Sequence, residues 1–163
     1  MSLPSKSLAA VAIATAISCA AEGQVITHRD IGTHMALKMV EAAIAKCEKN
    51  GGGLTVAVVD RQGQVRALAV ADKAAPHHVE LAQRKAYTAV TSRRSSADWA
   101  KATEPGSRIA GQRSMARVIP LAGGLPVKVG DETIGAVGVS GSQTEPDEVC
   151  SMAAVNAVAD SLK

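Results

Sequence analysis

The chain has 163 residues, with 18 basic and 15 acidic side chains and a formal net charge of +3. Its length predicts one domain around a single core, and an apolar fraction of 47% excludes global disorder. Phe is absent and only one Tyr and one Trp occur, which excludes nucleic-acid modules that stack bases on several aromatic rings. The same scarcity excludes a deep ligand pocket walled by aromatic side chains.

Residues 1–24 differ in composition from the rest of the chain. Lys6 precedes an apolar, Ala-rich run from Leu8 to Ala21 that ends in small residues. A charged start, an apolar stretch of about 7–15 residues and a small-residue exit are typical of a secretory signal peptide. The run is shorter than the roughly 20 apolar residues of a membrane-spanning helix. We therefore expect no membrane span. The segment is either a signal peptide, with export to the periplasm or medium favoured over the cytoplasm, or an extra N-terminal helix.

The expected state of the cysteines depends on whether residues 1–24 are a signal peptide. If a signal peptide is removed, Cys47 and Cys150 remain as an even pair that could form a disulfide in an oxidising compartment. Without export, all three cysteines are expected to be buried thiols. No C-x-x-C motif occurs, so a zinc site or a thioredoxin-type site is not supported.

After residue 25 the chain predicts a helix and then a β-hairpin. Thr27 with Asp30 three residues later is typical of a helix start, and apolar residues at helical spacing continue to about Asn50. Two runs rich in β-branched and apolar residues follow on either side of a turn. The predicted hairpin consists of strand 54–60, turn 61–64 and strand 65–71.

Further helices and a second hairpin are predicted in the remaining chain. We expect a long helix over residues 77–95, a helical turn near Trp99, and a short helix or irregular segment over 107–117. Three strand candidates follow, at 118–121, 125–129 and 134–139. The final helix runs to about Leu162 and begins with a capping oxygen, a first-turn proline and an acidic side chain, at Thr144, Pro146 and Asp147.

The order of these elements predicts the fold class. Strands joined by short turns pair antiparallel, because a parallel pair needs a crossover of about a dozen residues. We therefore expect residues 25–163 to form a single α+β domain. It is a sandwich with a largely antiparallel sheet of about five strands flanked by helices.

Glycines recur at every third residue at positions 135, 138 and 141. Backbone N–H groups in such a loop, followed by a helix N-terminus, can hold a carboxylate or phosphate, so Gly138, Ser140 and Gly141 are candidate anion-binding residues. The spacing matches neither a P-loop nor the G-x-S-x-G nucleophile elbow. The alternative is that the glycines let this strand pack closely against Ala-rich helices.

His77 and His78 stand at the start of the long predicted helix. Adjacent residues point in different directions on a helix, so these two do not form the chelating pair that i, i+4 spacing creates. One of them could ligate a metal or a haem iron as a single axial ligand. The alternative is that both are polar residues at a helix N-terminus.

Basic residues concentrate in the middle of the chain, between Arg84 and Arg117. They form either a solvated helical face or a site for an anionic ligand or an acidic patch of another subunit. Within this segment Lys85 and Thr88 share one helical face. A lysine and a hydroxyl on an Ala-rich face do not favour stability by themselves, so we expect them to contact an anionic group or a facing backbone.

Four motifs occur in order along residues 27–159. They are Thr55-Val-Ala-Val-Val-Asp60 with Gly63, Arg84-Lys85-Ala86-x-Thr88-Ala89 within 80–89, Ala122-Gly-Gly-Leu-Pro126, and Ile134-Gly-Ala-Val-Gly-Val-Ser-Gly141 followed by Asp147. In these motifs the chain resembles the GlcG-like haem-binding family. That family includes secreted haem-binding redox sensors and the C-terminal domain of PduO-type corrinoid adenosyltransferases. The chain departs from it at 71–76, where the family usually has an acidic or Met-Asp-Gly-like loop.

The resemblance implies a profilin-like sandwich that assembles into homo-oligomers, often octamers. It also implies a shallow or intersubunit site for haem or a related tetrapyrrole, and a function in haem or redox sensing. An axial group from His77 or His78 would meet the iron. Basic side chains of the long helix and the segment after it would pair with the propionates. The candidate haem-binding residues are His77, His78, Arg84, Lys85, Thr88 and Arg93.

Two other functions remain open. The first is a small-carboxylate binder, for example of 2-hydroxy acids, or an accessory protein that uses Lys85, Thr88 and the loop from Gly138 to Gly141. The second is a structural oligomeric module with no ligand. The sequence shows no recognisable nucleophile–base pair, paired carboxylates or metal triad, so we do not expect an enzyme.

Overall fold

The computed structural model describes residues 23, 25–47, 53–141 and 146–163. The predicted signal peptide or extra helix of residues 1–24 lies almost entirely outside the described residues, as do Cys19 and Thr144. The helices and strands in chain order are α1 (Thr33–Cys47), β1 (Thr55–Asp60), β2 (Val65–Val70), α2 (His77–Ser92), α3 (Ser96–Ala102), the 3-10 helix η2 (Ala110–Ser114), β3 (Gly124–Val129), β4 (Glu132–Ser140), α4 (Asp147–Asn156) and the 3-10 helix η3 (Ala159–Leu162).

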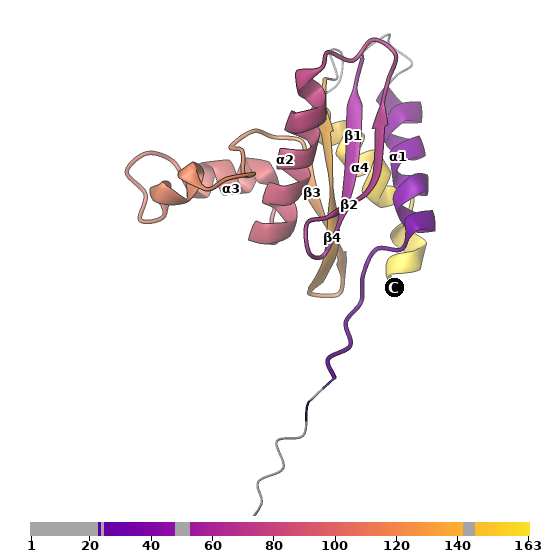
Figure 1. Cartoon of the computed structure of the whole chain (residues 1–163), viewed down its shortest axis with the longest axis horizontal. Helices are drawn as coiled ribbons and strands as arrows, with labels where there is room; N and C mark the ends of the chain where they lie inside the picture. The colour runs from indigo at the N-terminus through magenta and orange to yellow at the C-terminus, as the bar shows by residue number, and fades with distance from the viewer. Residues whose placement is uncertain (1–22, 24, 48–52, 142–145) are drawn as a thin grey trace, which may run out of the picture.

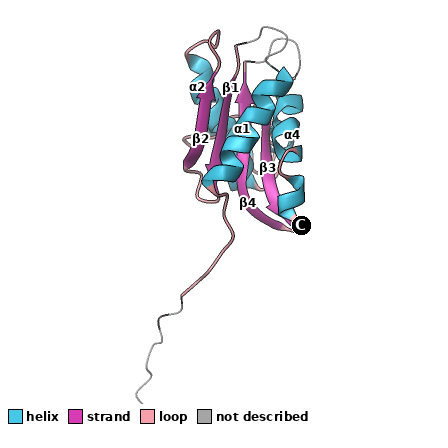
Figure 2. Ribbon diagram, turned by 90° about the vertical axis from the view of Figure 1, so that its right-hand side faces the viewer, coloured by secondary structure: helices cyan, strands magenta, loops and turns pink. Residues whose placement is uncertain are grey.

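The sheet has the strand order β2-β1-β4-β3, and every neighbouring pair is antiparallel (Figure 2). The β1–β2 and β3–β4 pairs are hairpins, and β1 and β4 join them in the middle. The predicted α+β class and antiparallel sheet are therefore confirmed.

The expected strand count of about five is corrected to four in the described part of the chain, because residues 118–121 form no strand. Side chains of α2 form hydrogen bonds with backbone groups of this segment. Thr88 Oγ1 accepts a hydrogen bond of 2.9 Å from the Ile119 N–H, and Arg84 Nη2 donates one of 2.7 Å to the Val118 carbonyl. The segment thus needs no strand partner to satisfy its backbone.

Helix α1 begins at Thr33, six residues later than the predicted start at Thr27. The Asp30 carboxylate accepts hydrogen bonds from the Ile31 N–H at 2.8 Å and from the Arg61 N–H at 3.0 Å. Asp30 therefore ties the chain before α1 to the β1–β2 turn, instead of supporting a helix that starts at Thr27.

Helices α1 and α4 cover one face of the sheet and α2 covers the other (Figures 1 and 2). The larger core lies under α1 and α4, where Met39, Val56 and Val137 are fully buried. The core under α2 consists mainly of alanine and valine, including Ala86 and Ala136. The segment that contains α3 and η2 projects beyond α2, away from the sheet (Figure 1).

Glycines allow α2 to lie directly on the strands. A Cβ atom at Gly138 would overlap the Ala82 carbonyl oxygen and the Ala86 backbone nitrogen, and one at Gly124 would overlap the Lys85 carbonyl. The interpretation that glycine lets this strand pack closely against an Ala-rich helix is therefore confirmed at Gly138. It explains how a layer of alanines can be buried completely.

Replacing Gly138 by alanine is expected to lower the free energy of unfolding by about 1–3 kcal/mol, because the helix backbone must move to admit one methyl group. Gly111→Ala is the matched control, since nothing lies within 4 Å of a Cβ at that position. Urea denaturation of both variants measures the difference. Equal midpoints for the two variants would contradict the close-packing interpretation.

Cys47, at the end of α1, and Cys150, in α4, form a disulfide whose Cα atoms are 5.9 Å apart. Of the two states expected for these cysteines, the structure therefore has the paired one. No helix in the described part of the chain is long and apolar enough to cross a membrane.

Candidate functional site

The two histidines at the start of α2 have different surroundings. His78 is half-buried, and its Nδ1 lies 3.1 Å from the Ser140 Oγ at the end of β4. A Cβ atom at Gly141 would lie 2.9 Å from the His78 ring, so the imidazole packs against the chain just after Ser140. His77 is exposed, with its ring centroid 4.2 Å from that of His78. The two imidazoles therefore lie side by side in different surroundings.

Lys85 is buried, with 3% of its surface exposed. Its Nζ donates to the Val139 carbonyl at 3.0 Å and to the Asp147 Oδ2 at 2.6 Å. A buried ammonium is costly unless it is paired and hydrogen-bonded, and these two contacts meet that need. The expected partners of Lys85, an anionic group or a facing backbone, are thus both supplied within the chain.

The other two predicted residues of α2 lie away from the histidines. Thr88 is fully buried, and its Oγ1 donates to the Arg84 carbonyl at 2.8 Å. Arg93 is exposed just after the end of α2, sixteen residues beyond His77, which is about 24 Å along the helix axis. Neither residue lines either of the two cavities near the start of α2 that are described below.

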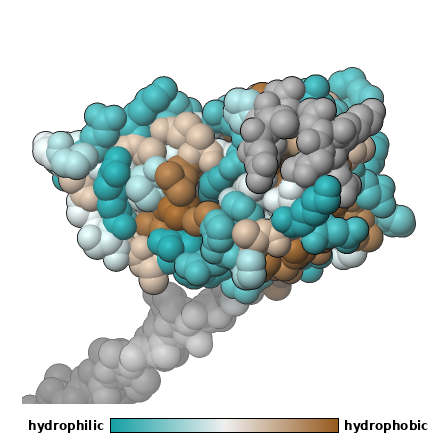
Figure 3. Space-filling view, turned by 90° about the horizontal axis from the view of Figure 1, so that it is seen from above, coloured by the Kyte–Doolittle hydropathy of each residue, from teal (hydrophilic) through white to brown (hydrophobic). Residues whose placement is uncertain are grey.

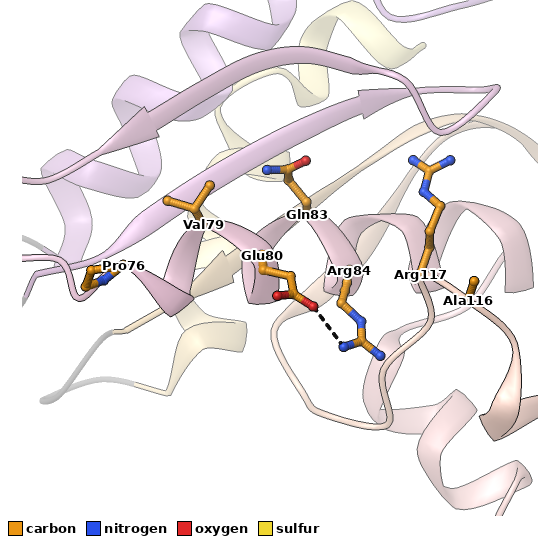
Figure 4. A pocket seen from close by; sticks show the side chains of 7 residues that line it. All are labelled: Pro76, Val79, Glu80, Gln83, Arg84, Ala116 and Arg117. Atoms are coloured by element: carbon orange, nitrogen blue, oxygen red, sulfur yellow. Dashed lines mark hydrogen bonds and ion pairs between the residues drawn. The ribbon is translucent and has the colours of Figure 1, made fainter.

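A first cavity, here called the outer pocket, lies along the solvent side of α2 and has a volume of about 650 Å³ (Figure 4). The Arg84 Nη1 pairs with the Glu80 Oε1 at 3.1 Å. The Arg117 guanidinium lies 3.9 Å above the centre of the Tyr87 ring and donates to the Gly63 carbonyl at 2.7 Å. The pocket is lined by Pro76, Val79, Glu80, Gln83, Arg84, Ala116 and Arg117.

Arg117 was not among the predicted site residues. The only sequence signal for it was its place at the end of the basic segment that begins at Arg84. The structure places both guanidinium groups at the outer pocket, although 33 positions separate the residues. Part of the basic segment therefore supports the fold through backbone contacts, and part of it borders a cavity.

A second cavity, here called the His78 pocket, has a volume of about 490 Å³. It lies at the end of the molecule where α2 begins, and that end carries an apolar patch framed by hydrophilic side chains (Figure 3). The cavity brings together four predicted residues but not Gly138, which lies under α2. It is lined by His78, Leu81, Lys85, Leu121, Ala122, Ser140, Gly141 and Asp147.

The surroundings of His78 favour its neutral form. Burial lowers the pKa of the imidazole below its ordinary value of 6.5, and the positive charges of His77 and Lys85 lower it further. The Asp147 carboxylate acts in the opposite direction, and burial is the largest cause. At neutral pH the imidazole can therefore accept a proton or a hydrogen bond.

The fold and the two cavities define the structural class of the protein. It is a small α+β sandwich whose outer pocket and His78 pocket both lie beside the first turns of α2. No group of three or more His, Cys, Asp or Glu side chains in the described residues could hold a metal ion. The chain belongs to the HbpS-like family, because the profile described as "Haem degrading protein HbpS-like" matches residues 31–156. The resemblance inferred from the four motifs is therefore confirmed.

Named relatives agree with this assignment. The chain is 32% identical to protein GlcG of Escherichia coli K12 over 110 residues, which cover 68% of this chain and 81% of GlcG. It superposes on a double mutant of Streptomyces reticuli HbpS with a TM-score of 0.75 and 29% identity, covering 88% of this chain and 97% of that one. For the solved PduOC:heme complex the TM-score is 0.73 and the identity 25%, with 78% and 94% covered.

Proposed function

We propose that the protein binds haem or a related tetrapyrrole in the outer pocket along α2. The observation that carries this proposal is the pairing of apolar walls with two arginines in a cavity of about 650 Å³. Ligand sites commonly have volumes of about 300–1,000 Å³, and arginine pairs well with carboxylates. A tetrapyrrole has this same combination of an apolar ring and carboxylate groups. The family description and the PduOC:heme complex support the choice of ligand.

His77 is the favoured axial ligand in this proposal. Positions 77 and 84 lie nearly two turns apart on one face of α2, about 10 Å along the axis, so His77 and Arg84 flank the same side of the helix. His78 remains the alternative, but its Nδ1 is engaged by Ser140. Lys85 is engaged by Asp147, so we assign the propionates to Arg84 and Arg117.

The Glu80 carboxylate should weaken ligand binding in this arrangement. Its carboxylate pairs with the Arg84 Nη1 at 3.1 Å, and 72% of its side chain is exposed. A bound propionate would compete with Glu80 for the guanidinium and would lie close to a like charge. Removing the Glu80 charge should therefore strengthen binding, whereas removing either arginine should weaken it.

The proposed site is shallow. The outer pocket lies on the solvent side of α2, and none of its lining residues is aromatic. One face of a bound ring would stay open to solvent or to a second copy of the chain. We therefore propose that a homo-oligomer, as the family resemblance implies, covers the ligand, and that haem or redox sensing uses this site.

Hemin titration followed by the Soret band tests the proposal. We expect a shifted Soret band, whose axial-ligand signature is lost in His77→Ala. Arg84→Gln and Arg117→Gln should each weaken binding about 3- to 10-fold, and Glu80→Gln should strengthen it about 2- to 5-fold. Native mass spectrometry with and without hemin reports the oligomer.

Arg93→Gln is the matched control, because Arg93 lies about 24 Å from His77 along α2. Circular dichroism of each variant shows whether the fold is kept. Absence of a Soret shift, or an equal loss of affinity in Arg93→Gln and Arg84→Gln, would overturn the assigned site.

A further inference from the structure

Ser140 and His78 form a hydroxyl–imidazole contact that joins β4 to α2. The Ser140 Oγ and the His78 Nδ1 are 3.1 Å apart, although 62 positions separate the residues. Nucleophilic serines lie within about 2.6–3.2 Å of their general base. The sequence shows no motif for such a pair, because only the fold brings these residues together.

The surrounding backbone holds the pair in place. Ser140 is the last residue of β4, and its cross-strand partner is Thr55. Gly141 follows with a φ of 102°, and a side chain there would collide with the His78 ring and the Gly53 carbonyl. Glycine at this position therefore lets the imidazole approach the chain at Ser140.

Thr55 places a second buried hydroxyl next to Ser140. Directly opposed residues of a sheet project from the same face, so Thr55 and Ser140 both face α2. The Thr55 Oγ1 is fully buried and has no hydrogen-bond partner among the residues that the structure describes. Buried polar groups without a partner are rare, and each one calls for an explanation such as a bound group.

The charges around His78 suit the role of a base. His77, Lys85 and Asp147 are the charged or titratable groups that act on it in the described structure. The neutral imidazole can accept the Ser140 proton. The Lys85 ammonium lines the same cavity and is fixed by Asp147, so it can stabilise negative charge that develops on a substrate oxygen.

We propose that the His78 pocket is an acyl-transfer site in which Ser140 is the nucleophile and His78 the general base. A cavity of about 490 Å³ with apolar walls at Leu81 and Leu121 fits a small ester with a short acyl chain. This proposal does not rest on tetrapyrrole binding, which concerns the outer pocket.

The chemistry balances without a cofactor. The Ser140 Oγ attacks the ester carbonyl carbon and forms a C–O bond, while its proton passes to the His78 Nδ1. The bond to the alcohol oxygen breaks, and His78 returns the proton to the departing alkoxide. Water then attacks the acyl-serine with His78 again as base, releasing the carboxylic acid and restoring the hydroxyl.

A fluorophosphonate probe and p-nitrophenyl acetate test this site in the full chain. We expect the probe to label the peptide that contains Ser140, and ester hydrolysis to follow the same residue. His78→Gln should slow both reactions about 100-fold or more, because a general base contributes a factor of about 10²–10⁴. The rates should also fall below pH 6.5, as His78 becomes protonated.

Ser92→Ala is the matched control, since the Ser92 hydroxyl donates to the Thr88 carbonyl at the far end of α2. A variant with Ser140→Cys separates reactivity from folding. The new thiol should be alkylated by iodoacetamide faster with His78 present than with His78→Gln, as peptide mapping would show. Labelling at another serine, or equal rates with and without His78, would overturn the proposal.

Discussion

Lys85→Ala is expected to lower the free energy of unfolding by about 3–5 kcal/mol, the usual effect of removing one partner from a buried ion pair. The Lys85 side chain is 4% exposed and that of Asp147 is 20% exposed, so water replaces the lost contact poorly. The Val139 carbonyl also loses its ammonium donor. Urea denaturation, with the midpoint and slope compared with those of the unchanged chain, measures the effect.

Lys38→Ala is the matched control, because Lys38 lies on the exposed side of α1. Lys85→Met keeps most of the packed volume and removes only the charge. Combining it with Asp147→Asn should recover part of the loss, since no buried carboxylate then lacks its cation. An effect of Lys85→Ala as small as that of Lys38→Ala would show that the pair does not support the fold.

The lysine also illustrates what the sequence could predict. Its place on an Ala-rich helical face indicated burial and a facing partner, and the structure has both. Its spacing could not identify Asp147, which lies 62 positions away at the start of α4. Periodicity reports which face of a helix is covered, but only tertiary packing decides which element covers it.

The prediction of a strand at residues 118–121 was wrong for a related reason. Residues 118–121 carry apolar side chains typical of a strand, and two of them, Val118 and Ile119, are buried as expected. Their backbone groups bond instead to the side chains of Thr88 and Arg84. Such side-chain partners compete with a sheet ladder, and local sequence patterns do not reveal them.

The candidate site was predicted in part. His78, Lys85, Ser140 and Gly141 were all selected from local patterns, and they line one cavity. Their grouping was not predicted, because they came from three separate sequence patterns: the histidine pair, the basic helix and the glycine-containing segment 135–141. The contact between His78 and Ser140 depends on α2 lying flat on β4, which in turn depends on the absence of a side chain at Gly138.

The double variant Cys47→Ala/Cys150→Ala is expected to lower the free energy of unfolding by about 2–5 kcal/mol. The disulfide joins residues 103 positions apart, so its loss allows the unfolded chain many more conformations. Both residues are fully buried between α1 and α4, and alanine at each position also leaves a small void. Thermal and urea unfolding measure the effect.

A reducing agent distinguishes the contribution of the disulfide bond to stability from the contribution of side-chain packing. The unchanged chain should lose stability in excess dithiothreitol, whereas the double variant should be insensitive to it. Because thiols refill most of the space that alanine leaves empty, the reduced chain should remain slightly more stable than the variant. If dithiothreitol lowers the unfolding midpoint of neither protein, the disulfide does not contribute to stability. If it lowers both midpoints equally, the agent acts elsewhere in the chain and the assignment to Cys47 and Cys150 is wrong.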